Sequence, residues 1–561
     1  MDREEEDIEL HRMSGDEDTG GDGRHESQTR LIRDEEEGGM ASYDEEQKPR
    51  QEGRIVKYVL FLTIPAILGF LVYLVATQQS PQEARDASPG AAPTGTSYPS
   101  GFDMRNNWGS YSPYFGHGTP FEGIEATDEE DVGPRAGLPR GCRYRQVHVL
   151  HRHADRFPTK TKTEQMQRVA QRLREMGEPP AAQLRWMKDW MYGLGTDLLV
   201  AKGVSAEFES GARFWASHGM QLYNATEKDK LFYDPDALNK YENGTARPKP
   251  VLRATNQSRI DTSARAWAAG FFGLHGNQGY TQTDPADVYE LVLMDEAEGQ
   301  NNTLAAYYSC PNGNDNATVE GDAQRRVFEW TERYLAKAQK RLQVLLPGYE
   351  NLTTLDAYAM QHICAFETAA FDGSPFCGLF TESEWRGYEY THDLDFYYQS
   401  GFGSPFGPAM GSGWLTELVA RLKGVQLRES THGVNTSVTS TFPIDQPFYL
   451  DMTHDSVIVS VLAALDLKFL DDELPHKKMV APRSFIISRL TPFAARLYVE
   501  LLECGDEMHV RMKLNDRILP LGDLYDCPDA TDGLCPFDKF RRSLEKRLNE
   551  IDFEKICYHD L

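Results

Sequence analysis

A short polar motif that directly follows an apolar run constrains this chain more than any other feature. Residues 146–150, which contain this run, are expected to form a strand, and the sequence RHADRFP follows at residues 152–158. His153 stands between Arg152 and Arg156, and a nearby like charge disfavours the charged form of a histidine. Guanidinium groups match phosphate oxygens in shape and charge. The motif predicts a neutral nucleophilic histidine beside an anion clamp; a buried structural histidine with surface arginines is the alternative.

A second polar pair follows another expected strand, at residues 447–451. His454 and Asp455 come next, and an apolar helical pattern begins at Ser456. Unpaired N–H groups and the helix dipole favour a phosphate at such a junction. We expect His454 to donate to phosphate oxygens and a protonated Asp455 to deliver its proton to a leaving alkoxide. A simple helix cap is the alternative for Asp455.

The remaining patterns predict an α/β or α+β protein, and the length of the region after residue 101 predicts a two-part globule. Further strands are expected at residues 496–502, 508–514 and 517–519, the last two as a hairpin around Asn515-Asp516. Helices are expected at residues 163–176 and 323–346. Polar residues at strand ends suit an α/β sheet, where ligands bind at the carboxyl edge.

Several further motifs follow in order, from about residue 108 to about residue 557. They are residues 108–115 (WGSYSPYF), Leu252-Arg253-Ala254 with Arg259, Asn302-Thr303-Leu304, residues 374–377 (SPFC), Gly407-Pro408, Gly413-Trp414 and residues 492–496 (PFAAR). Together with the two polar sites, they resemble the histidine acid phosphatases, most closely the fungal phytase-like branch. The resemblance implies a phosphoglycerate-mutase-like α/β sheet domain with a smaller helical domain over the cleft. It implies no cofactor and no metal.

Carried over residue by residue, the resemblance assigns a role to each group of the site. It implies that His153 is the nucleophile, that Asp455 is the proton donor, and that the phosphoryl group is bound by Arg152, Arg156, Arg253 and His454. The family usually has glycine where this chain has Ala154, and Asp155 adds a carboxylate. Both could reduce turnover or narrow the substrate range. A catalytically weak relative that binds phosphate ligands in the lumen is therefore the alternative function.

The eight cysteines all lie after residue 141. An even number in a region with glycosylation signals indicates disulfides, although the spacing leaves the connectivity open. The resemblance implies the pairs Cys142–Cys504, Cys310–Cys557, Cys364–Cys377 and Cys527–Cys535.

The uncharged, apolar residues 58–76 are long enough to cross a bilayer; a buried core helix is the alternative. Lys48, Arg50, Arg54 and Lys57 precede them, which predicts a cytosolic N-terminus. We therefore expect a cytosolic tail at residues 1–54, a transmembrane signal-anchor helix at 55–76, a flexible stalk at 77–100 and a lumenal or extracellular catalytic domain at 101–561. We expect a single-pass type II membrane protein of the vacuole, secretory pathway or cell surface.

The tail is acidic, with nineteen acidic and seven basic residues among the first 53. Such a composition predicts disorder. The whole chain has a formal net charge of −27, so it offers no basic surface for a nucleic acid.

Glycosylation signals all lie after the expected span. We expect sugar on Asn224, Asn243, Asn301, Asn316, Asn351 and Asn435, but not on Asn256, which lies near Arg253. The expected function is a membrane-anchored acid phosphatase that hydrolyses phosphomonoesters through a phosphohistidine. Phytate is a possible substrate, with Lys160 and Lys162 as candidates for a basic rim.

Overall fold

The computed structural model describes residues 101–115, 121, 137–176, 181–226, 233–273, 284–297, 299–314, 321–349 and 351–559. The expected tail, membrane helix and stalk lie outside these residues, as does Asn316. No helix within the described ranges is both long and apolar enough to cross a bilayer.

A mixed sheet organises the described residues. Its order is β3-β2-β4-β1-β5-β6-β7, and β8 pairs with β6. The strands are β1 (Cys142–Arg152), β2 (Val251–Thr255), β3 (Glu290–Met294), β4 (Phe448–Thr453), β5 (Arg496–Cys504), β6 (Glu507–Leu514), β7 (Arg517–Ile518) and β8 (Cys535–Pro536). The neighbours β3, β2, β4 and β1 run parallel to one another, whereas β5 to β8 pair antiparallel. The four parallel strands therefore end at one edge of the sheet.

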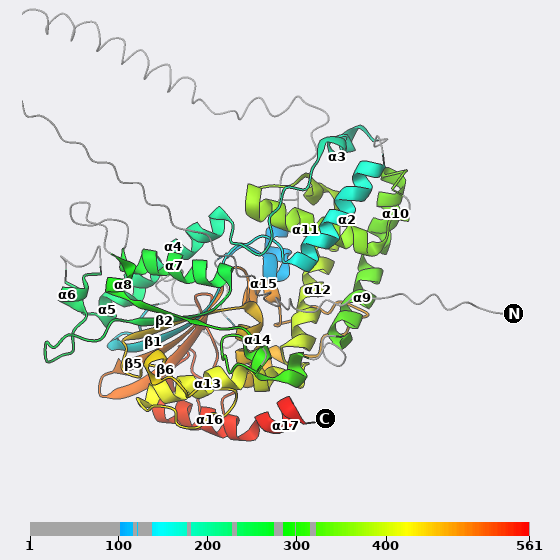
Figure 1. Cartoon of the computed structure of the whole chain (residues 1–561). Coiled ribbons are helices and arrows are strands. Elements are labelled where there is room, and N and C mark those ends of the chain that lie inside the picture. Colours follow the sequence, from blue (N-terminus) through cyan, green and yellow to red (C-terminus); the bar gives the residue numbers. More distant parts are fainter. Residues whose placement is uncertain are drawn as a thin grey trace, which may run out of the picture. The chain divides into compact units, whose positions relative to one another are not determined.

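Helices surround this sheet (Figure 1). The α-helices are α2 (Lys160–Glu175), α3 (Trp186–Asp189), α4 (Ala201–Phe214), α5 (Met220–Leu222), α6 (Pro235–Leu238), α7 (Ser258–Phe272), α8 (Pro285–Val288), α9 (Gly321–Tyr334), α10 (Ala336–Leu345), α11 (Thr354–Phe371), α12 (Glu382–Gln399), α13 (Gly407–Lys423), α14 (Asp455–Ala464), α15 (Ile487–Leu490), α16 (Phe537–Glu550) and α17 (Phe553–Tyr558). A π-helical turn, η5 (Trp215–Gly219), extends α4. Short 3-10 turns include η2 (Gly109–Tyr111) and η6 (Ala306–Ser309).

The two faces of the sheet bury different side chains because strand residues alternate in direction. Val149 of β1 packs with α4 and α7 on one face. Leu150 packs with α13, α14 and α16 on the other. A third core, which includes Leu173, Leu342 and Phe366, joins α2, α10 and α11; Figure 1 shows these helices beside the sheet. The α/β class expected from the sequence is confirmed.

The expected strands are all present, and most extend beyond the predicted limits. The hairpin turn places Asn515 and Asp516 at φ values of 51° and 66°, the left-handed region that a tight two-residue turn requires. One prediction is wrong: the single helix expected at residues 323–346 is divided into α9 and α10 at Leu335, which is fully buried.

Four disulfides confirm the pairing implied by the family resemblance. They are Cys142–Cys504, Cys310–Cys557, Cys364–Cys377 and Cys527–Cys535, and they leave no free cysteine. Cys142–Cys504 ties the start of β1 to the end of β5, its antiparallel neighbour. A cross-link between distant residues limits the unfolded ensemble, so this bond stabilises the folded state.

Candidate active site

The carboxyl ends of the four parallel strands each supply a polar side chain to one place. His153 follows β1, His454 follows β4, Arg259 lies near the start of the helix after β2, and Glu296 follows β3. Open α/β sheets bind ligands at this edge, because the strands end there and helices begin. The fold therefore gathers residues that are up to about 300 positions apart in the sequence.

His153 is held in one tautomer by the backbone of the residue that follows it. Its side chain is buried, and Nδ1 lies 2.9 Å from the carbonyl oxygen of Ala154. A carbonyl oxygen only accepts, so Nδ1 carries the hydrogen and donates it. Nε2 of His153 is left with its lone pair, which is the form a nucleophile requires.

The surroundings of His153 keep the ring neutral. Burial lowers the pKa of His153 well below its ordinary value, and the charges of Arg152, Arg156, Arg259 and His454 lower it further. Each effect disfavours the imidazolium form. A neutral His153 is therefore maintained in acid, where a free histidine would be protonated.

The guanidinium of Arg152 is fixed by two carbonyl oxygens, an aromatic ring and a carboxylate. Its Nη1 donates to the carbonyl oxygens of Ser110 and Thr491, the latter at 2.7 Å, and its guanidinium stacks 4.8 Å from the ring centre of Phe493. Its Nη2 lies 2.7 Å from Oδ2 of Asp455. Arg152 thus links the end of β1 to the start of α14.

Three arginines near His153 keep unpaired donors. The Nε–H groups of Arg152, Arg156 and Arg259 are buried and have no acceptor within the described part of the chain. Arg156 uses Nη1 to bond the carbonyl oxygen of Phe157 at 2.9 Å, and Nη1 of Arg259 lies 3.6 Å from Asp197. Buried donors without acceptors are costly. An anion with several oxygens would satisfy them.

The structure corrects the assignment of Arg253 to this site. Arg253 lies in the middle of β2, where its Nε bonds Asp451 at 2.7 Å and its two terminal nitrogens bond Glu417 at 2.9 and 2.7 Å. Arg421 binds the same Asp451 at 2.6 Å. The guanidinium of Arg253 is thus saturated by carboxylates in the core. Arg259, six residues later, is the arginine that acts on His153.

Asp455 is the first residue of α14, and His454 is the residue that precedes the helix. Oδ1 of Asp455 accepts from the backbone N–H of Ser456 at 3.0 Å. Burial alone would raise the pKa of Asp455, but Arg152, Arg156 and His454 hold it below its ordinary value. Those cations are the groups that a bound phosphate would neutralise, so binding should raise the pKa of Asp455 again.

Glu296 is a site residue that the sequence analysis missed. Its Oε1 lies 2.9 Å from Nε2 of His454, and its side chain is only 4% exposed. The rings of His454 and His153 are 5.9 Å apart, centre to centre, and nearly perpendicular. Glu296 therefore contacts His454, a residue predicted to bind phosphate. It lies in the acid-rich sequence DEAEG, and no sequence signal separates it from its acidic neighbours.

The two unusual residues of the motif are both accommodated. Ala154 is fully buried and has a φ outside the left-handed region, so its backbone does not require glycine. Burial raises the pKa of Asp155 to about 6, although Lys202 opposes this shift. In acid, Asp155 is therefore largely uncharged and does not repel an anionic substrate.

Charged groups of both signs interact with one another next to Asp455. Lys162 of α2 and Asp395 of α12 are both partly buried. The Nζ of Lys162 lies 5.7 Å from the ring centre of Tyr358. Burial raises the pKa of Asp395 to about 6; the charge of Lys162 opposes this shift and that of Asp455 adds to it. A carboxyl group thus accompanies the lysine that was expected to form a basic rim.

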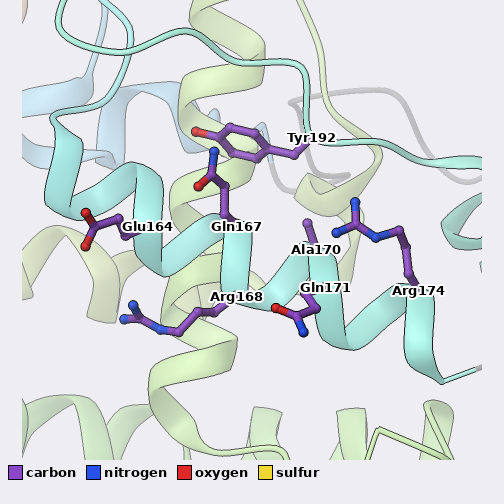
Figure 2. Close-up of a pocket in the computed structure, with 7 residues that line it drawn as sticks. All are labelled: Glu164, Gln167, Arg168, Ala170, Gln171, Arg174 and Tyr192. Atoms are coloured by element: carbon purple, nitrogen blue, oxygen red, sulfur yellow. The ribbon is translucent and has the colours of Figure 1, made fainter.

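A shallow pocket of about 580 Å³ lies along the outer side of α2 (Figure 2). Its lining residues are Glu164, Gln167, Arg168, Ala170, Gln171, Arg174 and Tyr192. None of them is among the residues around His153. We therefore do not assign this pocket to the site.

The fold and the site combine a mixed α/β sheet with a buried, neutral histidine that is surrounded by arginines at the carboxyl edge of the sheet. Residues 143–515 match the histidine phosphatase superfamily (branch 2), and the chain belongs to this family. It is accordingly an enzyme, a phosphomonoesterase.

The relatives and structures to which this chain is similar include fungal phytases. The chain is 31% identical to Phytase A of Aspergillus oryzae over 451 residues, which cover 78% of this chain and 87% of that protein. It is 30% identical to Phytase A of Emericella nidulans over 497 residues, which cover 86% of this chain and 96% of that protein. The crystal structure of the phytase from D. castellii has the same fold, with a TM-score of 0.63 and 21% identity. The match covers 84% of this chain and 92% of that one.

Proposed function

We propose that this chain is an acid phosphatase that hydrolyses phosphomonoesters through a covalent phosphohistidine at His153. The observation that carries the proposal is the state of that ring: Nδ1 donates to Ala154, Nε2 is free, and burial and neighbouring cations keep it unprotonated. No other described side chain at this edge combines a lone pair with such cationic surroundings. The geometry thus supports attack on phosphorus by Nε2.

In the first step, a P–N bond forms to Nε2 of His153 while the ester P–O bond breaks. Arg152, Arg156, Arg259 and His454 bind the phosphoryl oxygens, and their positive charge compensates the charge that develops. Asp455 protonates the departing ester oxygen. In the second step, water attacks the phosphohistidine, the P–N bond breaks, and Asp455 accepts the proton of the water.

The expected acid optimum follows from the opposite requirements of two groups. His153 must be neutral, and burial with its arginine neighbours ensures this down to low pH. Asp455 must be protonated when substrate is bound, although the empty site holds its pKa below the ordinary value. Activity should therefore fall as pH rises and Asp455 loses its proton.

The mixed charge next to Asp455 bears on the substrate. Phytate carries many negative charges and requires a basic rim, yet Asp395 accompanies Lys162 here. Because burial and Asp455 raise the pKa of Asp395 to about 6, this rim becomes more favourable to polyanions in acid. We therefore propose a broad monoesterase that also accepts phytate in acid, as the names of its relatives suggest.

The proposal is tested by the turnover of purified full-length protein from about pH 2.5 to about pH 7.5. An aryl phosphate and phytate are the two substrates, and the His153→Ala variant is the control. Acid-favoured hydrolysis that depends on His153 is the expected result. Normal phosphate binding without turnover at any pH would instead favour the alternative of a phosphate-binding relative, for which Ala154 and Asp155 give no structural support.

The correction of Arg253 to Arg259 makes a separate prediction. Arg259→Ala should lower kcat/KM by about 100-fold and weaken inhibition by inorganic phosphate, because a charged donor to the phosphoryl group is lost. The fold should remain stable, since the ion pair of Arg259 within the described part of the chain is the long contact to Asp197 at 3.6 Å. The measurements are steady-state kinetics and urea unfolding.

Arg253→Ala is the matched comparison and should fail in a different way. It leaves Glu417 and Asp451 buried without one of their cations, which should cost about 3 to 5 kcal/mol of unfolding free energy. If Arg253→Ala were stable and lost phosphate affinity while Arg259→Ala kept it, Arg253 and not Arg259 would be the phosphate-binding residue.

We also propose the membrane anchor and lumenal orientation expected from the sequence. They are supported by the uncharged residues 58–76, by the cations that precede them, and by four disulfides in the described domain. Asn224, Asn243, Asn351 and Asn435 are exposed and available for glycosylation. Asn301 is less suitable, because its Nδ2 donates to Ser430 at 2.9 Å.

Alkaline extraction and glycosidase treatment of cell membranes test this topology. The full-length protein should stay in the membrane pellet and lose mass on deglycosylation, and Asn243→Gln should remove one sugar step. Release by alkaline extraction would contradict a transmembrane helix.

A further inference from the structure

The carboxylate of Glu296 receives hydrogen bonds from four directions. Nε2 of His454 and the hydroxyl of Tyr307 each lie 2.9 Å from one of its oxygens. The hydroxyl of Thr255 and the amide of Gln257 complete the set. These donors come from the end of β2, the residue before α7, the turn η6 and the residue before α14. A carboxylate with this many donors cannot change its position freely.

The contact with His454 determines which nitrogen faces the phosphate site. Nε2 of His454 is engaged by Glu296, whereas no described residue offers an acceptor to Nδ1. His454 precedes α14, but its side chain does not cap that helix. The ring is held instead between Glu296, the ring of Tyr307 at 6.2 Å and the ring of His153 at 5.9 Å.

Glu296 also keeps its charge in acid. Burial alone would raise the pKa of Glu296, but His454, Thr255 and Tyr307 together hold it at about 2. The ionised carboxylate therefore contributes fully to folding stability at any pH above the pKa that Glu296 has in the unfolded chain. This contribution is lost as the pH falls through the folded-state pKa of about 2. Across the acid range in which the enzyme is proposed to work, the carboxylate remains ionised beside His454.

We propose that Glu296 is a positioning residue that acts through His454. Glu296 accepts from Nε2–H of His454 and thereby directs Nδ1, which is also a donor in the imidazolium form of the ring, at the transferred phosphoryl group. This inference rests on the proposed function, which makes His454 a phosphate ligand. It assigns to Glu296 a role that neither polar motif of the sequence contains. An imidazole oriented in this way gives its hydrogen bond to phosphate without first losing rotational freedom.

The alternative is that Glu296 only stabilises the fold by joining β2, η6 and α14. The two roles differ in their coupling to His454. If Glu296 acts through the ring, removing the ring also removes the effect of Glu296; if it acts through the fold, the two losses add.

Four proteins test the inference: the full-length wild type, Glu296→Gln, His454→Ala and the double variant. Glu296→Gln keeps the shape of the side chain and should lower kcat/KM for an aryl phosphate by roughly 10- to 100-fold, because a hydrogen bond to a charged group is weakened. In the His454→Ala background the same change should cost less than about 3-fold. Equal losses in both backgrounds would overturn the proposal.

Asp295→Asn is the matched control. Asp295 is the adjacent carboxylate, but it is exposed, and its Oδ1 accepts from the side chain of Asn256 at 2.9 Å. The Asp295→Asn substitution should leave kcat/KM unchanged within about 2-fold, because interactions of exposed side chains contribute little. A loss equal to that of Glu296→Gln would show that the effect is one of local charge and would contradict a specific role.

Binding of inorganic phosphate by calorimetry separates this inference from the proposed function. If the wild type binds phosphate without turnover, the proposed function fails, but the same four proteins still report the coupling in phosphate affinity. If the wild type turns over and the double-variant cycle shows no coupling, only the role of Glu296 is wrong.

Discussion

His153→Ala is expected to abolish turnover, with a loss of about 10⁴-fold or more in kcat. The variant removes Nε2, the only atom proposed to form a bond with phosphorus, and no described neighbour can replace it. His454 engages Glu296 through Nε2, and Arg152 is held by two carbonyl oxygens and Asp455. The measurement is kcat for an aryl phosphate at the acid optimum of the wild type.

The His153→Ala substitution should reduce turnover without weakening the fold or the binding of phosphate. The arginines that bind phosphate remain, and the ring of His153 makes one hydrogen bond, to the adjacent residue. Thermal unfolding and inhibition by phosphate should therefore change little, because neither the fold nor the anion clamp depends on the ring. If His153→Ala retained more than about a tenth of wild-type kcat, a phosphohistidine mechanism would be excluded.

Asp455→Asn should lower kcat by about 10²- to 10⁴-fold for substrates with poor leaving groups. An alkyl phosphate releases a strongly basic oxygen that needs a proton, whereas a nitrophenyl phosphate does not. The loss should therefore be much smaller for the nitrophenyl ester. Comparing the two substrates at one acid pH measures the contribution of the proton donor.

Phosphate affinity provides the control for Asp455. Its carboxylate lies 2.7 Å from Nη2 of Arg152, so the amide removes a negative charge from the anion clamp. Phosphate should bind Asp455→Asn at least as tightly as it binds the wild type. Equal loss for both leaving groups, with weaker phosphate binding, would indicate that Asp455 orients Arg152 and donates no proton.

The sequence predicts the parts of this site that are local in the chain. His153 and His454 follow apolar strands directly, so their position at the carboxyl edge follows from the alternation of strand and helix. The disulfide connectivity could not be derived from spacing, and it came from the family resemblance alone.

The error at Arg253 has a physical origin. Both Arg253 and Arg259 belong to the segment that carries the resemblance, but only the second lies beyond the end of β2. Arg253 lies within the strand, between buried neighbours Leu252 and Ala254. The rule that places ligands beyond strand ends would have favoured Arg259.

Contacts between distant elements could not be predicted from the sequence. Glu296 and His454 are 158 positions apart, and their contact depends on the parallel order of β3, β2 and β4. Asp395 and Lys162 come from different helices, α12 and α2. The division between α9 and α10 at Leu335 has no proline or glycine to mark it.

Trapping of the phosphorylated enzyme tests the central claim most directly. Full-length protein is mixed with substrate, quenched in alkali within milliseconds, digested and analysed by mass spectrometry. The mechanism predicts one phosphoryl group on the peptide that contains His153, absent from His153→Ala and accumulating when the dephosphorylation step is slowed. A phosphoryl group on another residue, or rapid turnover with no trapped intermediate under any condition, would contradict it.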